Sequence, residues 1–157
     1  MKHVLRRLKA MTMLNLANHI IARAQKDGTG ITNLQLQKVL YFSIIEGLKQ
    51  NIIDKEWVKN EYDNQFLVWR YGPVVEDVYE RYSIFGASKI FLPQEENDNY
   101  QMLNNIIDSL LHKNVFDLVN RSHKHAHWIE NEDRINYGRS NVPYDLEDLI
   151  NAASGAK

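Results

Sequence analysis

The histidines of His-Lys-His-Ala-His, at positions 123, 125 and 127, are the densest group of side chains able to do chemistry. On one helix, His123 and His127 would share a face four residues apart, a spacing that can hold a metal ion, and His125 would point away. A working zinc site also needs a third or fourth ligand and groups that orient the ligands. Histidines near a helix C-terminus are equally typical of surface and packing positions. His123 and His127 are therefore weak metal candidates, and we expect no cofactor.

Other catalytic patterns are missing from the sequence. It contains no cysteine, which removes thiolate zinc sites, disulfides and cysteine nucleophiles. Its glycines form neither kind of phosphate-binding loop, and no serine lies in a Gly-x-Ser-x-Gly turn. Carboxylate pairs such as Glu76 and Asp77 fit a solvated helix start better than acid–base catalysis. We expect a protein that is not an enzyme.

A cluster of aromatic and charged residues between positions 69 and 82 has the composition of a binding site. Tyrosine, tryptophan and arginine are enriched at the energetic centres of protein interfaces. Core packing explains Trp69 better than contact with a partner does, whereas both explanations fit Arg70 and Tyr71. We predict that a partner protein is contacted by Arg70, Tyr71, Glu80 and Tyr82.

The overall charge disfavours nucleic acid as the main partner. The formal net charge is −1, whereas phosphate binding usually needs a basic excess. The exception is a basic arm over residues 1–11, which could touch phosphate weakly or extend the first helix. No apolar run reaches the roughly 20 residues that span a bilayer, so we expect a cytoplasmic protein. Met1, Met11 and Met13 remain alternative start positions.

The elements that must position these residues are mostly helices. Apolar residues recur at helical spacing over residues 11–25, 33–50, 102–111, 115–123 and 144–153. Thr32, with Gln35 three residues later, is typical of a helix N-cap. Residues 66–71 favour a strand, and Pro73 suits the first turn of a new helix. We predict a mainly α fold, a compact bundle of five to six helices with a small β-hairpin before the Trp-x-Tyr-Gly-Pro turn, in one domain over residues 12–157.

Three stretches, in order, resemble the Panacea-domain family, also described as SocA-like antitoxins and GepA-type phage-associated proteins. They are Ile-Thr-Asn-Leu-Gln-Leu-Gln-Lys-Val-Leu-Tyr-Phe at 31–42, Trp-Arg-Tyr-Gly-Pro-Val-Val-Glu-Asp-Val-Tyr at 69–79, and Leu-Val-Asn-Arg-Ser-His at 118–123 with Trp128 five residues on. His127 replaces the proline usual before that tryptophan. The matching positions, which we assign mainly to the scaffold, are Thr32, Leu36, Gln37, Lys38, Leu40, Tyr41, Trp69, Gly72, Pro73, Val74, Tyr79, His123 and Trp128.

The resemblance implies a helical protein of a bacterial or prophage toxin–antitoxin system. Such a protein neutralises a protein toxin, encoded by an adjacent gene, through direct binding. Two alternatives stay open: an adaptor that delivers a partner to a ClpXP-type protease, and a phage-encoded interaction protein without a toxin partner. For the scaffold, we expect His123 and Trp128 to brace the C-terminal helices against the Gly72-Pro73 turn.

Overall fold

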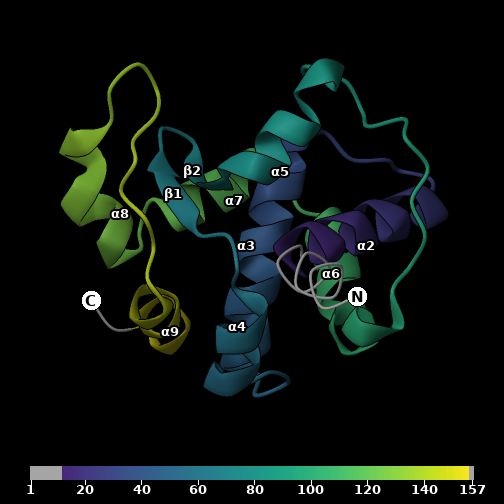
Figure 1. The fold of residues 1–157 in the computed structure, drawn as a ribbon, viewed down its shortest axis with the longest axis horizontal. Coiled ribbons are helices and arrows are strands. Elements are labelled where there is room, and N and C mark those ends of the chain that lie inside the picture. The colour runs from purple at the N-terminus through teal and green to yellow at the C-terminus, as the bar shows by residue number, and fades with distance from the viewer. Residues whose placement is uncertain (1–11, 156–157) are drawn as a thin grey trace, which may run out of the picture.

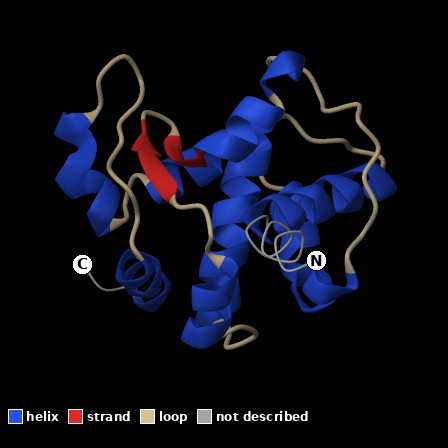
Figure 2. Cartoon of the chain, in the orientation of Figure 1, coloured by secondary structure: helices blue, strands red, loops and turns tan. Residues whose placement is uncertain are grey.

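The chain is mainly helical and carries one small antiparallel sheet, as the sequence predicts. A computed structural model describes residues 12–155, so the basic arm at 1–11 lies outside the described residues. Over 12–155 there are eight α-helices, three short 3-10 helices and one two-stranded sheet (Figure 2). The number of helices exceeds the predicted five to six.

Each element has the following bounds. The helices are α2 (Thr12–Asp27), α3 (Asn33–Lys49), α4 (Lys55–Glu61), α5 (Glu76–Arg81), α6 (Asn104–Leu111), α7 (Val115–Ser122), α8 (Ala126–Asn131) and α9 (Leu146–Ser154). The strands are β1 (Phe66–Trp69) and β2 (Gly72–Val75), and the 3-10 helices are η1 (Ser83–Phe85), η2 (Asp98–Leu103) and η3 (Glu132–Arg134).

Helix α3 is the axis of the fold. It contacts α2, α6, α7, α9 and β2, and Figure 1 shows it between α2 and α6 on one side and the hairpin, α8 and α9 on the other. The scaffold residues Leu36, Leu40 and Tyr41 are fully buried on it. The Thr32 side chain accepts a hydrogen bond from the Gln35 amide, which confirms the predicted cap, while the Gln35 side chain donates to Leu111 O instead of closing a capping box.

The first turn of helix α2 is capped by Asp63, a carboxylate distant in sequence. The two oxygens of Asp63 accept hydrogen bonds from the backbone amides of Thr12 and Met13, at 3.2 and 2.9 Å. These amides have no partner within the helix, and a negative charge also suits the positive end of the helix dipole. Asp63 therefore ties the loop before β1 to the first turn of α2.

The hairpin differs from the prediction in one respect. The Trp-x-Tyr-Gly-Pro residues form the turn of the hairpin itself: Arg70 and Tyr71 occupy the turn, and Trp69 pairs with Gly72. Pro73 lies in strand β2, and the next helix begins only at Glu76, so the prediction of a helix starting at Pro73 is wrong. Proline is tolerated here because position 73 makes no use of an amide donor.

The outer edge of β1 is covered by a segment from the far end of the chain. Val68 donates its amide to Val142 O at 3.0 Å, and Tyr144 donates to Phe66 O at 2.8 Å. This segment connects η3 to α9 and runs beside β1 (Figure 1). In the described part of the chain no helix has the length and apolarity needed to cross a membrane.

Candidate protein-binding groove

Buried polar side chains of α3 hold the backbone of β2. Gln37 accepts a hydrogen bond from the Val75 amide at 3.0 Å, and Lys38 Nζ donates to Pro73 O at 2.6 Å. The amide oxygen of Asn33 accepts a hydrogen bond from the Gln37 side chain at 3.3 Å, and the Asn33 amide nitrogen donates to Tyr79 O at 3.0 Å. These polar residues of α3 thus satisfy the free edge of the hairpin, because buried backbone groups need partners.

Lys38 is an unusual group in this network. Its side chain is fully buried, and burial alone lowers its pKa well below the usual range of a lysine. Transfer of an ammonium ion into the core is costly, so the neutral amine is favoured. Lys38 Nζ nevertheless keeps a hydrogen bond in the core, to Pro73 O. Gly72, at φ +102°, leaves room for it, since a Cβ there would lie 3.0 Å from Lys38 Nζ and 2.4 Å from Ser122 Oγ.

Two residues at the α7–α8 junction hold the turn of the hairpin. The indole of Trp128 donates to Trp69 O at 2.9 Å, and His123 Nε2 donates to Arg70 O at 2.9 Å. The two rings stack, with centroids 3.7 Å apart. Burial lowers the pKa of His123, although its hydrogen bond to Arg70 O opposes this shift. This contact between the C-terminal helices and the turn is the bracing expected of His123 and Trp128.

On its outward side the turn forms one wall of a groove of about 630 Å³. The opposite wall is the loop after η3, where Arg70 donates its amide to Gly138 O at 2.9 Å. The guanidinium of Arg139 lies 4.4 Å from the centroid of the Trp69 ring and 5.5 Å from that of Tyr79. The groove is therefore lined by aromatic rings, and the guanidinium of Arg139 packs against two of them. This packing fixes the shape of the groove.

The rim of the groove carries two exposed tyrosines. Tyr71 is 49% exposed and Tyr137 is 99% exposed, and the latter has a left-handed φ of +54°. Backbone strain of this kind is characteristic of functional loops. Arg70 is also exposed and lies 5.5 Å over the Tyr71 ring. Exposed tyrosines and arginines around an aromatic floor are the composition of an interaction hot spot.

The structure brings together three of the four predicted contact residues. Arg70 and Tyr71 line the groove, and Glu80 lies at its edge, paired with Arg139 at 3.5 Å. Tyr82 was predicted as a partner contact, and that prediction is wrong. Its side chain is 0% exposed, and its hydroxyl donates to Asn18.

Sequence reasoning missed the second wall of the groove. Ile135, Tyr137 and Arg139 line it, although they lie far along the chain from the hairpin. The only signal for them in the sequence is the Tyr-Gly-Arg composition of positions 137–139, which is typical of an exposed turn. Trp69, Val74 and Tyr79, which were assigned to the scaffold, also line the groove from below.

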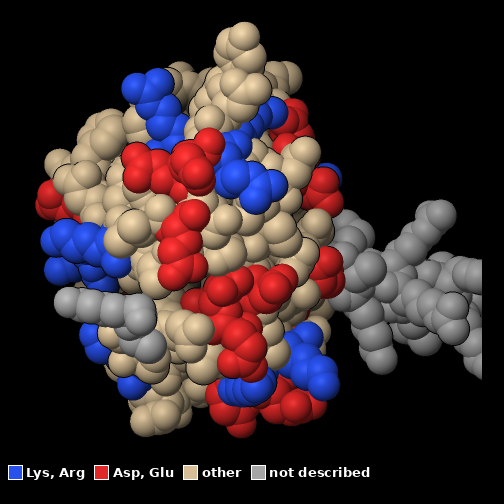
Figure 3. Space-filling view, turned by 90° about the vertical axis from the view of Figure 1, so that its left-hand side faces the viewer, with Lys and Arg blue, Asp and Glu red and all other residues tan. Residues whose placement is uncertain are grey.

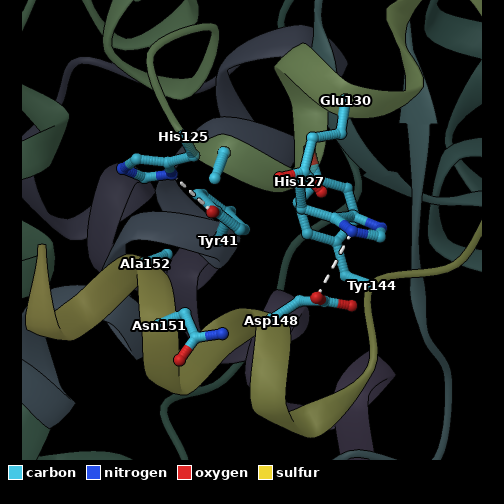
Figure 4. Close-up of a pocket in the computed structure, with 9 residues that line it drawn as sticks. Tyr41, His125, His127, Glu130, Tyr144, Asp148, Asn151 and Ala152 are labelled. Carbon is cyan, nitrogen blue, oxygen red and sulfur yellow. Dashed lines mark hydrogen bonds and ion pairs between the residues drawn. The ribbon is translucent and has the colours of Figure 1, made fainter. Parts of the chain in front are cut away.

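The histidines do not converge on a metal site. The helix that would place His123 and His127 on one face does not exist, because α7 ends at Ser122 and α8 begins at Ala126. His123 faces the hairpin, whereas His127 Nε2 donates to Pro143 O at 2.7 Å and its Nδ1 lies 3.3 Å from Asp148 (Figure 4). Within residues 12–155 no group of three or more histidine or carboxylate side chains is placed to bind a metal ion.

Comparisons with protein-family models, with curated proteins and with solved structures find no match for this chain.

Proposed function

We propose that this chain is an antitoxin-type protein of the Panacea-domain kind, which neutralises a protein toxin by binding it in the groove over the β1–β2 turn. The observation that carries the proposal is the exposure of Arg70 and Tyr71 on a rigidly held hairpin, across the groove from the exposed Tyr137 of the loop after η3. Four hydrogen bonds, made by Gln37 and Lys38 of α3, by His123 and by Trp128 of α8, fix the backbone of the hairpin. A fixed backbone lowers the entropy lost on binding, which favours affinity.

The chemistry of the groove supports a polypeptide partner. Its aromatic floor and exposed rim suit insertion of apolar side chains from a partner, and Arg70 can pair with an acidic group. The groove covers only part of a stable interface, which buries roughly 1,200–2,000 Å² in total. The partner would therefore also contact surfaces around it.

The test is co-expression with the product of the adjacent gene. We expect that product to stop growth alone and the wild-type chain to restore it. Tyr137→Ala and Arg70→Ala should lose the rescue, because each removes an exposed contact without disturbing the core. Ile52→Ala is the matched control, since Ile52 is an exposed apolar residue at the α3–α4 loop, outside the groove. Full rescue by both groove variants would argue against the proposal.

A second candidate function, a proteolytic adaptor, requires a second binding surface. One feature favours it: two large apolar residues after α5 are exposed outside the groove, Ile84 at 87% and Phe91 at 75%. Phe91 packs edge-on against Phe85, with ring centroids 6.0 Å apart. If the chain is an adaptor, Phe91→Ala should lengthen the half-life of the bound partner in cells and leave its affinity unchanged.

A further inference from the structure

A small cavity separate from the groove lies between α8, α9 and α3. Its volume is about 160 Å³, and its lining includes Tyr41, His127, Glu130, Tyr144, Asp148 and Asn151 (Figure 4). A cavity of about 150 Å³ is large enough for a benzene-sized group. The planar end of a long side chain therefore fits in this space.

Several groups around the cavity are already satisfied. The Tyr41 hydroxyl and His125 Nδ1 are hydrogen-bonded at 2.6 Å. His127 lies between Pro143 O and Asp148, and the second oxygen of Asp148 accepts the Asp145 amide at 2.7 Å. These bonds fix the walls, so the cavity keeps its shape.

Two groups of the lining have no partner. The hydroxyl of Tyr144 is buried and makes no hydrogen bond to any described residue. Burial, together with the neighbouring tyrosines and Asp148, raises its pKa, so the phenol stays protonated. The exposed carboxylate of Glu130 also forms neither a hydrogen bond nor an ion pair within residues 12–155. A buried polar atom left without a partner calls for an explanation, and a ligand is one.

The surface around the cavity is acidic. Figure 3 shows this side of the molecule, with Asp and Glu forming a band down the middle of the face. Elements α8, η3 and α9, with the N-cap of α9, contain the acidic residues Glu130, Glu132, Asp133, Asp145, Glu147 and Asp148, and the only lysine or arginine on them is Arg134. Such a field attracts a cation and repels an anion.

We propose that the cavity is a binding site for an arginine side chain of a basic partner polypeptide. A planar guanidinium suits a cavity walled by tyrosine and histidine rings, and it donates hydrogen bonds in the directions that carboxylates accept. Glu130 and Asp148 supply the charge, and Tyr144 and Asn151, which also line the cavity, carry further oxygen acceptors. This inference rests on the proposed function in one respect, namely that the partner is a polypeptide.

The test uses a small molecule, so that its outcome is independent of the toxin. N-acetyl-arginine methylamide is titrated into the purified full chain and followed by amide chemical shifts. We expect shifts at His127, Tyr144 and Asn151, and weaker binding of the isosteric but neutral N-acetyl-citrulline methylamide. The lysine analogue should bind more weakly than the arginine derivative, because ammonium lacks the planar fork.

Two variants separate a binding site from a structural one. Tyr144→Phe removes a hydroxyl that makes no bond, so the free energy of unfolding should stay the same or rise while affinity for the arginine derivative falls by about fivefold. Glu130→Gln should weaken affinity to a similar extent, about fivefold. The matched control is Glu132→Gln, which removes the same charge only two residues away but outside the cavity lining. Equal binding of the arginine and citrulline derivatives, or affinity unchanged in both cavity variants, would overturn the proposal.

Discussion

Replacement of Lys38 by methionine should change how the stability of the fold depends on pH. Lys38 is fully buried on α3, and burial is the sole cause of its lowered pKa, with no carboxylate contributing. Methionine has a similar length and flexibility, so it can fill the space of the lysine stem. The substitution therefore removes one titrating group and one hydrogen bond, to Pro73 O, from the core.

The sign of the effect follows from proton binding in the two states. The unfolded chain holds a proton on Lys38 up to a pKa of about 10.4, whereas the folded chain has released it at a lower pH. Between these two pKa values unfolding takes up a proton, so the stability of the wild type rises with pH. The slope is up to about 1.4 kcal/mol per pH unit. Buried tyrosines such as Tyr62, whose pKa is raised by burial, oppose this rise only above the ordinary tyrosine pKa of about 10.

Urea unfolding of the wild type and Lys38→Met at pH 8 and pH 9 measures this slope. We expect the stability of the wild type to rise more steeply with pH than that of the variant, by up to about 1.4 kcal/mol per pH unit where the pH lies between the folded and unfolded pKa values of Lys38, because all other titrating groups are common to both. Parallel pH dependences in the two proteins would refute the reasoning, since they would mean that Lys38 keeps its proton in the folded state.

Three further substitutions test the contacts that hold the hairpin and the first helix. Trp128→Phe leaves a hairpin carbonyl without its indole donor and should lower the free energy of urea unfolding by about 2 kcal/mol, with faster amide exchange in β1 and β2; unchanged exchange would contradict this role. Asp63→Ala removes both side-chain hydrogen bonds at the start of α2 and should lower that free energy by about 1 kcal/mol; no change would show that Asp63 is not a cap. Gly72→Ala places a Cβ at φ +102° 2.4 Å from Ser122 Oγ and should destabilise by on the order of 3 kcal/mol in thermal unfolding. Gly28→Ala, at φ +82° with open space around it, is the control and should lose less.

Patterns local in sequence account for the parts of the fold that could be predicted. The apolar spacing and the Thr32 cap placed α3 close to its observed bounds, because both depend on neighbouring residues. Helix α4 was not predicted, since its seven residues are too few to show a periodicity. Pro73 was predicted to start a helix from local sequence alone, whereas two side chains of α3 hold it in a strand: Lys38 donates to Pro73 O, and Gln37 accepts from the Val75 amide.

The candidate site depends on contacts that no local pattern contains. The hairpin wall was predicted from its composition, whereas Tyr137 and Arg139 reach the groove through a segment that pairs with β1 from far along the chain. For Tyr82 a usable signal existed: it lies four residues after Val78, and residues so spaced share a helix face, which here is buried. The composition of an aromatic cluster therefore indicated the site, and the helical period would have indicated which of its members face inward.

The central claim is that the groove over the β1–β2 turn contacts a protein partner. Hydrogen–deuterium exchange of this chain, with and without the purified product of the adjacent gene, tests it most directly. We expect slower exchange of backbone amides in residues 69–72 and 135–140 and no change at 51–54, the loop between α3 and α4. Protection confined to elements outside the groove, or no protection at saturating partner, would contradict the claim.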